Sequence, residues 1–334
     1  MKTLMQYLVL GVALMLLFFG ANRMRAGERT ENPEPISETT SQTQPPVELL
    51  PTEPTVPETV RQIRLEETVS PDCMDAEHVF VYDTEQGEMV LCTTSETEQL
   101  YPASITKLFS AWVALQMLPE DLVVTAGWEL GFLQPGSSQA FIALDSRLTV
   151  ETIIEGMLLP SGNDAALVLA AATGRWILGK PNATASEAVA AFVSEMNRAA
   201  EILEFQNSHF ENPDGYHSPG HYSCPADLAK IAALALDEPV LRRCMALQRD
   251  TVTFASGETH HWENTNRLLN PESSCYQPEA VGMKTGYTGQ AGYCLMAAFG
   301  EENPLVVGIF GSKDPVSRYE DAAEIYAAWL ALPE

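Results

Sequence analysis

The apolar pattern of this chain changes its period twice, and these changes restrict the folds that the chain can adopt. Residues 78–82 and 89–92 are short apolar runs on either side of a turn segment, residues 83–87, as expected for two paired strands. A long middle part has the apolar spacing of helices, and the last part returns to strand-like runs before a closing helix. We expect helices at 104–118, 149–159, 165–178, 187–203, 225–236 and 319–332, and later strands at 280–285, 293–299 and 305–310.

Strands on both sides of a helical middle predict one sheet that is built from the two ends of the chain, with the helices inserted between them. The expected class is therefore α+β. The sequence contains no internal repeat, no glycine-rich phosphate loop and no dinucleotide-binding fingerprint, and we expect no cofactor.

An almost unbroken apolar run, residues 4–21, precedes the folded part. About 18 residues at about 1.5 Å rise nearly cross a hydrocarbon core of about 30 Å. Two interpretations of residues 1–26 remain open, an uncleaved membrane anchor and a cleaved signal peptide. The anchor fits better, because Phe19, Met24 and Arg25 interrupt the small-residue frames that a cleavage site needs. Both interpretations predict that the rest of the chain lies outside the cytoplasm, either membrane-anchored or secreted.

Residues 27–72 are rich in Pro, Glu, Thr and Ser and poor in large apolar side chains. A segment of this composition cannot bury enough surface to offset its ordering entropy, so we expect a disordered linker. Proline keeps such a linker extended, and its reach is on the order of 100 Å. The folded domain is then expected at residues 73–334.

The formal net charge of −26, from 19 Lys and Arg against 45 Asp and Glu, bears on the possible partners. It argues against nucleic acid, whose phosphates are bound by basic side chains, and against broad adhesion to anionic lipid. The six cysteines allow up to three disulfides in an oxidising compartment, or buried free thiols, and the sequence does not choose between them.

Ser104-Ile105-Thr106-Lys107 follows Pro102 at the start of a predicted helix. Residues three apart share a helix face, so the hydroxyl of Ser104 and the amine of Lys107 can meet. A serine becomes a nucleophile when a base takes its proton, and lysine is such a base only if burial or a second cation lowers its pKa. Alone the pattern is weak, because a serine at a helix start is usually an N-cap.

Ser161-Gly162-Asn163 lies in the break between two predicted helices, where Gly162 allows a tight, exposed turn and Asp164 can cap the next helix. A hydroxyl in this turn can relay a proton, and an amide can hold a peptide carbonyl. The composition is common in loops, so the motif alone is weaker than the first.

Lys284-Thr285-Gly286 lies on a predicted strand. The lysine supplies a second cation and attracts a carboxylate, and the hydroxyl beside it can donate to that carboxylate. Glycine lets a substrate backbone lie close to a strand edge. By itself, a Lys-Thr-Gly sequence on a strand occurs mostly by chance and does not indicate a function.

The order of the three motifs is that of class A β-lactamases and penicillin-binding proteins. Over about residues 76–330 the chain resembles the low-molecular-mass penicillin-binding proteins that are serine-type D-alanyl-D-alanine carboxypeptidases. The stretches that carry this resemblance are 101–108, 158–166, 210–215 and 282–288, together with the hairpin at 81–88. The resemblance implies an antiparallel sheet of about five strands flanked by helices, with a helical subdomain inserted beside the serine.

The resemblance also implies roles for single residues. Ser104 is the acylated nucleophile, Lys107 its base, and Ser161, helped by Lys284, passes a proton to the leaving D-alanine. Asn163 positions the substrate amide. The remaining members of the implied substrate-binding set are Thr285 and Arg318 for the terminal carboxylate, Gly286 at the strand edge, and Tyr287, whose backbone N–H forms an oxyanion hole with that of Ser104.

The implied reaction removes the terminal D-alanine from peptidoglycan stem peptides that end in D-Ala-D-Ala, with β-lactams as covalent inhibitors and no metal. Three alternatives remain: a D,D-endopeptidase, a β-lactamase, and a low-turnover wall-binding or β-lactam-sensing protein. A β-lactamase needs fast deacylation, for which class A enzymes use a glutamate in an Ω-loop. Glu211 lies in a predicted loop, but the surrounding sequence Phe-Glu-Asn-Pro is the one found in the carboxypeptidases.

The chain departs from many relatives, which carry a second β-rich domain and a C-terminal amphipathic anchor, whereas this sequence ends at Glu334. The N-terminal apolar run is expected to take the place of that anchor. Tyr287 stands where some relatives have histidine, and little effect is expected because only its backbone is implicated. His217 and His221 have metal-ligand spacing, but Pro219 and Gly220 forbid the helix that would align them.

Overall fold

The computed structural model describes Leu65 and residues 74–332. The predicted anchor or signal peptide, almost all of the predicted linker, Cys73 and the last two residues lie outside the described residues. Within residues 74–332, no helix has both the length and the hydropathy needed to cross a bilayer.

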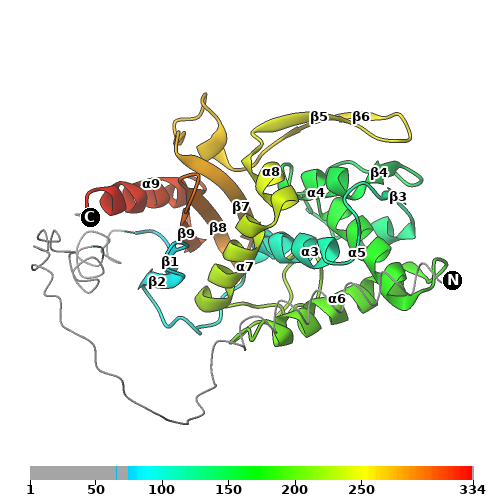
Figure 1. Cartoon of the computed structure of the whole chain (residues 1–334), viewed down its shortest axis with the longest axis horizontal. Coiled ribbons are helices and arrows are strands. Elements are labelled where there is room, and N and C mark those ends of the chain that lie inside the picture. The colour runs from blue at the N-terminus through cyan, green and yellow to red at the C-terminus, as the bar shows by residue number, and fades with distance from the viewer. Residues whose placement is uncertain (1–64, 66–73, 333–334) are drawn as a thin grey trace, which may run out of the picture. The chain divides into compact units, whose positions relative to one another are not determined.

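A five-stranded sheet with the order β2-β1-β9-β8-β7 forms the centre of the fold (Figure 1). Every neighbouring pair is antiparallel. The first two strands come from the start of the folded part and the other three from its end, which confirms the α+β prediction of one sheet built from both ends. The strands are β1 His78–Asp83, β2 Glu88–Cys92, β7 Ala280–Thr288, β8 Gly292–Phe299 and β9 Leu305–Ser312.

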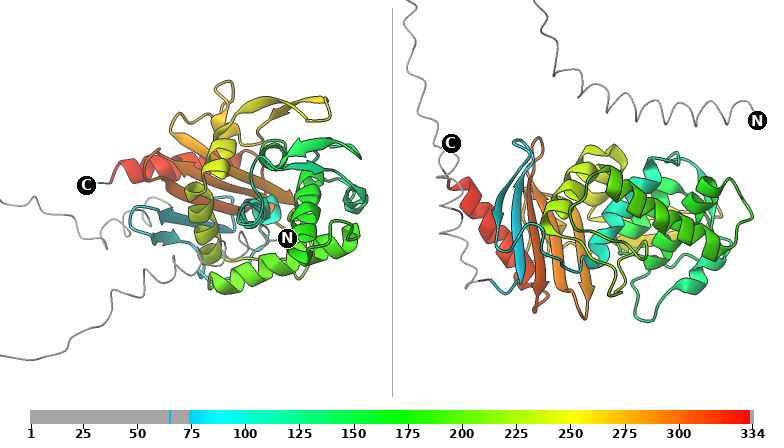
Figure 2. Two further views of the ribbon diagram at one scale, coloured as in Figure 1. Left: turned by 45° about the vertical axis from the view of Figure 1, so that its right-hand side comes forward. Right: turned by 90° about the horizontal axis from the view of Figure 1, so that it is seen from below.

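Helices cover both faces of this sheet (Figure 2). The closing helix α9, Ser317–Leu330, packs on one face through Tyr319, Ala322 and Ile325. The inserted helices lie on the other face. They are α3 Thr106–Leu115, α4 Val150–Leu158, α5 Asn163–Leu178, α6 Ala185–Ile202, α7 Pro225–Asp237 and α8 Pro239–Ala246.

Several short elements were not predicted. Helix α8 follows α7 after one residue, and the strand pairs β3–β4 and β5–β6 project from the helical part. His260 and His261 lie in β6. These elements are β3 Val123–Thr125, β4 Arg147–Thr149, β5 Arg249–Thr253, β6 Thr259–Glu263, and the 3₁₀ turns η1 Ala103–Ile105, η2 Trp128–Phe132 and η3 Arg267–Leu269.

The predicted helix starts, except that of α7, differ from the structure by one or two residues, and two of these differences bear on the three motifs. Ser104 lies in η1 rather than in the first turn of an α-helix, because Ala103 has a left-handed φ of 47° and α-helical geometry begins only at Thr106. Helix α5 begins at Asn163, so Asp164 lies in its first turn and does not cap it.

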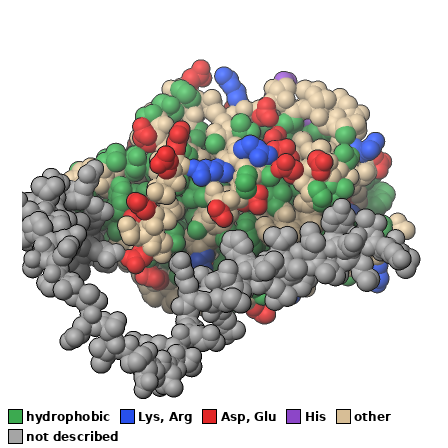
Figure 3. Space-filling view, in the orientation of Figure 1, with side chains coloured by type: hydrophobic (Ala, Val, Ile, Leu, Met, Phe, Trp, Pro, Cys, Tyr) green, Lys and Arg blue, Asp and Glu red, His purple; other side chains and the backbone are tan. Residues whose placement is uncertain are grey.

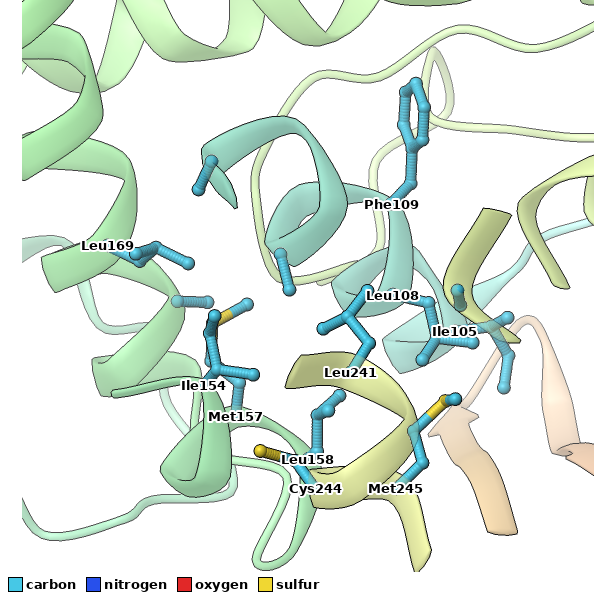
Figure 4. Close-up of a cluster of buried hydrophobic side chains, with 14 of the residues drawn as sticks. Ile105, Leu108, Phe109, Ile154, Met157, Leu158, Leu169, Leu241, Cys244 and Met245 are labelled. Carbon is cyan, nitrogen blue, oxygen red and sulfur yellow. The ribbon is translucent and has the colours of Figure 1, made fainter. Parts of the chain in front are cut away.

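The start of α3 is held by a large apolar core (Figure 4). Ile105, Leu108 and Phe109 are fully buried. Leu108 lies near Leu158 of α4 and Leu241 of α8, whereas the ring of Phe109 packs against those of Phe205 and Phe210. Burial of one such side chain contributes about 1.5–3 kcal/mol, so the residues on either side of Ile105 have a well-defined position.

The cysteines of the described part form no disulfide. Cys92, Cys224, Cys244, Cys275 and Cys294 are all free thiols. The last four are buried, as the second alternative from the sequence predicts, whereas Cys92 is half-buried. Burial raises the pKa of Cys294 to about 12, which makes it a poor nucleophile.

On the face shown in Figure 3, acidic side chains are scattered among basic and apolar ones rather than gathered in one patch.

Candidate active site

Lys107 joins the first motif to two distant segments. Its Nζ lies 2.8 Å from Ser104 Oγ, 2.8 Å from Asn163 Oδ1 and 2.7 Å from the carbonyl oxygen of Asp214. The side chain is fully buried. The predicted meeting of the Ser104 hydroxyl and the Lys107 amine is therefore present, with the amide of Asn163 in the same cluster.

Burial lowers the pKa of Lys107 to about 8, against the opposing charges of Asp214 and Asp164. A lysine with this pKa is partly neutral near neutral pH, and its neutral amine can accept the proton of a hydroxyl 2.8 Å away. The physical condition that the sequence set for a lysine base, burial, is met.

The loop of residues 209–222 holds this cluster from the side. A Cβ on Gly215, which has a φ of 78°, would lie 1.8 Å from the carbonyl oxygen of Ala103, so only glycine allows the loop to approach η1 this closely. Residue 215 thus brings the carbonyl of the preceding residue, Asp214, to Lys107.

His221 fixes the other end of the same loop. Its Nδ1 accepts a hydrogen bond from the backbone N–H of Glu211, so its Nε2 carries the proton and donates to Thr106 Oγ1, which in turn donates to the carbonyl of Ala103. Burial lowers the pKa of His221 to about 3, so the ring is neutral. Both ring nitrogens are engaged within the protein, and neither is free to bind a metal.

Ser161 and Lys284 form a second buried pair. Lys284 Nζ donates to Ser161 Oγ at 2.8 Å and to the carbonyl of Thr285 at 2.8 Å. Burial lowers the pKa of Lys284 well below its ordinary value, and the charges of Lys107 and Arg318 lower it further. The site therefore contains two buried amines, each hydrogen-bonded to a serine hydroxyl, and the charge of Lys107 acts on the pKa of Lys284.

The Ser161–Asn163 turn differs from its prediction in two respects. It is buried rather than exposed, and the left-handed residue is Ser161, with a φ of 63°, whereas Gly162 has a φ of −59°. Gly162 is required because a Cβ there would lie 2.7 Å from the backbone nitrogen of Ala140. Residue 162 is therefore a glycine because of close packing, and the strained left-handed backbone conformation is at Ser161.

Asn163 and Asp164 connect this turn to the preceding loop. The amide of Asn163 donates from Nδ2 to Ser137 Oγ while its Oδ1 accepts from Lys107. The carboxylate of Asp164 accepts the backbone N–H groups of Ala140 and Ile142. Asp164, predicted as a helix cap, instead holds the loop that carries the hydrogen-bond partner of Asn163.

Strand β7 closes the site with the third motif. It is the last strand of the sheet, so one of its edges has no neighbouring strand in the described sheet. A Cβ on Gly286 would lie 3.0 Å from the backbone nitrogen of Ser104, which shows how closely this strand passes η1. Thr285 Oγ1 lies 2.6 Å from Thr265 Oγ1, and the ring of Tyr287 is exposed and stacked on Tyr293.

Arg318 contacts the backbone of this strand. Its Nη1 donates to the carbonyl oxygens of Gly286 at 3.1 Å and Cys294 at 3.0 Å, and its Nη2 donates to Tyr319 Oη. The guanidinium thus ties α9 to β7 and β8. Its role towards a substrate carboxylate, and the oxyanion hole formed by the N–H groups of Ser104 and Tyr287, remain predictions.

Sequence reasoning assigned no role to three groups that shape the site, the carbonyl of Asp214 and the hydroxyls of Ser137 and Thr265, and it assigned a different role to the carboxylate of Asp164. All four act through contacts between distant segments. A backbone carbonyl carries no signal in residue type, and only the resemblance of residues 210–215 pointed to that loop.

Comparison with known proteins places these features in context. Residues 65–313 match the peptidase S11 family, described as D-alanyl-D-alanine carboxypeptidase. The D-alanyl-D-alanine carboxypeptidase DacF of Bacillus subtilis is 29% identical over 251 residues, which are 73% of this chain and 59% of that protein. The chain therefore spans less than two thirds of that relative.

Two further similarities come from Streptomyces. The D-alanyl-D-alanine carboxypeptidase of Streptomyces sp. strain K15 is 31% identical over 239 residues, covering 69% of this chain and 78% of that protein. The crystal structure of the Streptomyces K15 DD-transpeptidase superposes with a TM-score of 0.68 at 29% identity, over 78% of this chain and 98% of that one.

Proposed function

Because this chain belongs to the D-alanyl-D-alanine carboxypeptidase family of serine peptidases, we propose that it removes the terminal D-alanine from peptidoglycan stem peptides. The observation that carries this proposal is the pair of buried lysine–serine contacts. Lys107 and Ser104 form one and Lys284 and Ser161 the other, each at 2.8 Å. A single such pair activates one hydroxyl, and two pairs provide both a nucleophile and a separate proton donor for the leaving group.

In the proposed acylation, neutral Lys107 takes the proton from Ser104 Oγ, which attacks the carbonyl carbon of the penultimate D-alanine. The backbone N–H groups of Ser104 and Tyr287 stabilise the resulting oxyanion, and each donor of this kind contributes about 2.7–4 kcal/mol. The close approach of β7 to η1 at Gly286 supports this arrangement.

The leaving D-alanine needs a proton on its nitrogen as the peptide bond breaks. Ser161 is 2.8 Å from Lys284 Nζ and is proposed to pass this proton, with the lysine resupplying it. Thr285 and the positive charge of Arg318 are proposed to bind the terminal carboxylate, and Asn163 the amide of the substrate. The product of this step is an ester between Ser104 and the shortened stem peptide.

Water then hydrolyses the ester and regenerates Ser104. An amine acceptor in place of water would give peptide-bond transfer, the activity for which the Streptomyces K15 DD-transpeptidase is named. A β-lactam, whose amide carbonyl takes the position of the scissile bond, is proposed to acylate the same serine and to leave it slowly.

The N-terminal apolar run supports a further proposal, that the domain acts outside the cytoplasm and is anchored to the membrane. This location matches a substrate in the cell wall. Separation of membranes from the medium, followed by immunodetection of the chain, checks it: release of the domain into the medium would favour a cleaved signal peptide.

One experiment separates the proposed activity from its alternatives. The full chain is incubated with a fluorescent penicillin and, separately, with an acyl-D-Ala-D-Ala peptide. Stable labelling together with release of D-alanine is expected. Labelling without release would indicate a β-lactam sensor, and rapid turnover of the penicillin a β-lactamase.

A further inference from the structure

Three side chains of the kind that bind metal ions lie together where helices α4 and α8 meet, and none of them belongs to the candidate active site. Glu151 and Glu155 are four residues apart on α4, so their carboxylates share one face of that helix. Cys244 lies on α8 and is only 1% exposed. One carboxylate oxygen of each glutamate and the Sγ of Cys244 all lie within 4.8 Å of one another.

The thiol of Cys244 is a buried polar group that forms no hydrogen bond within the described residues. A buried free cysteine usually packs as a small apolar side chain, and Cys244 is indeed part of the larger apolar core (Figure 4). Its sulfur nevertheless faces two carboxylates. Burial, followed by the charges of Glu155 and Glu151, raises the pKa of this thiol well above its ordinary value.

The carboxylates around the thiol carry more negative charge than their basic neighbour neutralises. Burial, followed by the charges of Asp250 and Glu151, raises the pKa of Glu155 to about 7. Arg243 Nη2 donates to Glu151 Oε1 at 2.6 Å and also to Glu120 Oε2 at 3.3 Å. One guanidinium is therefore shared among several carboxylates, and it occupies only one oxygen of Glu151. A second cation at this place would relieve the remaining repulsion.

We propose that Glu151, Glu155 and Cys244 bind one Zn²⁺ ion, which joins α4 to α8. Zinc binds thiolate sulfur at about 2.3 Å and carboxylate oxygen at about 2.0–2.2 Å, so neighbouring ligand atoms of a tetrahedral site lie about 3.6 Å apart. Both glutamates are half-buried, and rotation of their side chains brings the oxygens to this spacing. Calcium and magnesium prefer oxygen ligands alone, so the sulfur favours zinc.

The proton balance of this binding step is simple. Cys244 releases its thiol proton to the solvent as the zinc–sulfur bond forms, and a water molecule completes the four ligands. Ions reach the site from the solvent along the half-buried side chains of Glu151 and Glu155.

The place of the ion gives it a structural role. Helix α4 ends three residues before Ser161. Helix α8 packs against β7 so closely that a Cβ on Gly282 would collide with the carbonyl of Met245. A zinc ion between α4 and α8 holds together the elements that position Ser161 and the strand of Lys284. The inference does not depend on the proposed function, because the ion takes no part in that reaction.

Titration of the full chain with a metal probe tests this site. Bound metal is first removed with a chelator under reducing conditions, and Co²⁺ is then added, because cobalt bound to a thiolate absorbs in the near ultraviolet. We expect this absorption band at one cobalt per chain, and Zn²⁺ should displace the cobalt. Cys244→Ala should abolish the band, whereas Cys224→Ala, which changes another fully buried cysteine, should preserve it.

A second variant keeps the test independent of changes in the core. Glu155→Gln preserves the volume of the side chain and should weaken zinc binding at least about tenfold. Glu201→Gln, at an exposed position of α6, should leave binding unchanged. Zinc should also raise the Tm of the unmodified chain by about 5 °C when its free concentration is about 100 times the measured Kd.

Three results would overturn the assignment: no cobalt–thiolate band with the unmodified chain, a band that persists in both Cys244→Ala and Glu155→Gln, or a Tm that does not respond to zinc. Penicillin labelling and D-alanine release by the unmodified chain report separately on the proposed function. Zinc binding without D-alanine release would leave the metal site in place and contradict only the proposed reaction.

Discussion

At the scale of single residues, the chemistry depends on the cost of burying a charge. Lys107 and Lys284 are both fully buried, and burial lowers the pKa of each. Ser104 and Ser161 are thereby placed next to amines that can exchange protons. An exposed lysine at the same distance would stay protonated and could not act as a base.

Replacement of the proposed nucleophile gives the most direct test. Ser104→Ala should abolish both penicillin labelling and D-alanine release. Within the described residues, no other hydroxyl forms a hydrogen bond with Lys107 Nζ. Ser95→Ala, which changes an exposed serine, serves as the control and should leave both signals intact. Retained labelling of the Ser104→Ala protein would defeat the assignment.

The lowered pKa of Lys107 predicts a pH profile. The reactive form is the neutral amine, so kcat/KM for acylation should rise about tenfold per pH unit below about 8 and level off above it. Lys107→Ala should slow acylation by about 10²- to 10⁴-fold and remove this rise. Stopped-flow measurement of penicillin acylation between pH 6 and pH 9 checks the profile, and a rate independent of pH would exclude Lys107 as the base.

At the scale of elements, the site depends on a loop pressed against a short turn. Gly215 allows the 209–222 loop to reach the carbonyl of Ala103, and the same contact brings the carbonyl of Asp214 to Lys107. The position of the lysine thus depends on the packing of two backbone segments as well as on its own helix.

A matched pair of glycine substitutions tests this contact. Gly215 and Gly136 have the same φ of 78°, but a Cβ on Gly136 meets nothing within 4 Å. Gly136→Ala should cost about 1–2 kcal/mol for the left-handed backbone alone. Gly215→Ala should cost about 1–3 kcal/mol more, because its Cβ collides with a backbone carbonyl, and should also slow acylation. Urea unfolding compares the two, and equal losses would show that the contact is dispensable.

At the scale of the whole molecule, the sheet separates two apolar clusters. The larger contains the inserted helices and the smaller contains α9. Arg318 crosses between them, because it starts on α9 and donates to carbonyls of β7 and β8. The far side of the sheet is in this way linked to the strand that carries the third motif.

Replacement of this arginine tests the link. Arg318→Lys keeps the charge but cannot reproduce the planar set of donors, so it should lower the free energy of unfolding by about 1.5–3 kcal/mol. Arg267→Lys, at an exposed position, is the control. Urea unfolding gives the free energies, and KM for the peptide reports on carboxylate binding. An unchanged stability with a raised KM would indicate that Arg318 acts on the substrate alone.

Local spacing allowed much of this protein to be predicted from its sequence. The alternation of strands and helices, the α+β class and the Ser104–Lys107 contact follow from patterns within about ten residues, because helix and strand periods are local properties. The family was identified from the resemblance of short stretches such as 101–108 and 158–166. The comparisons confirm the family, and the sheet order confirms that the two ends of the chain pair.

The tertiary structure decided the rest. Three features of the site depend on segments far apart in the chain: the left-handed conformation of Ser161, the hydrogen bond from Lys107 to the carbonyl of Asp214, and the hydrogen bonds from the neighbouring loop to the carboxylate of Asp164. A backbone acceptor or a strained dihedral leaves no mark in residue type, and the burial that lowers the pKa of two lysines exists only once the helices and the sheet have closed around them.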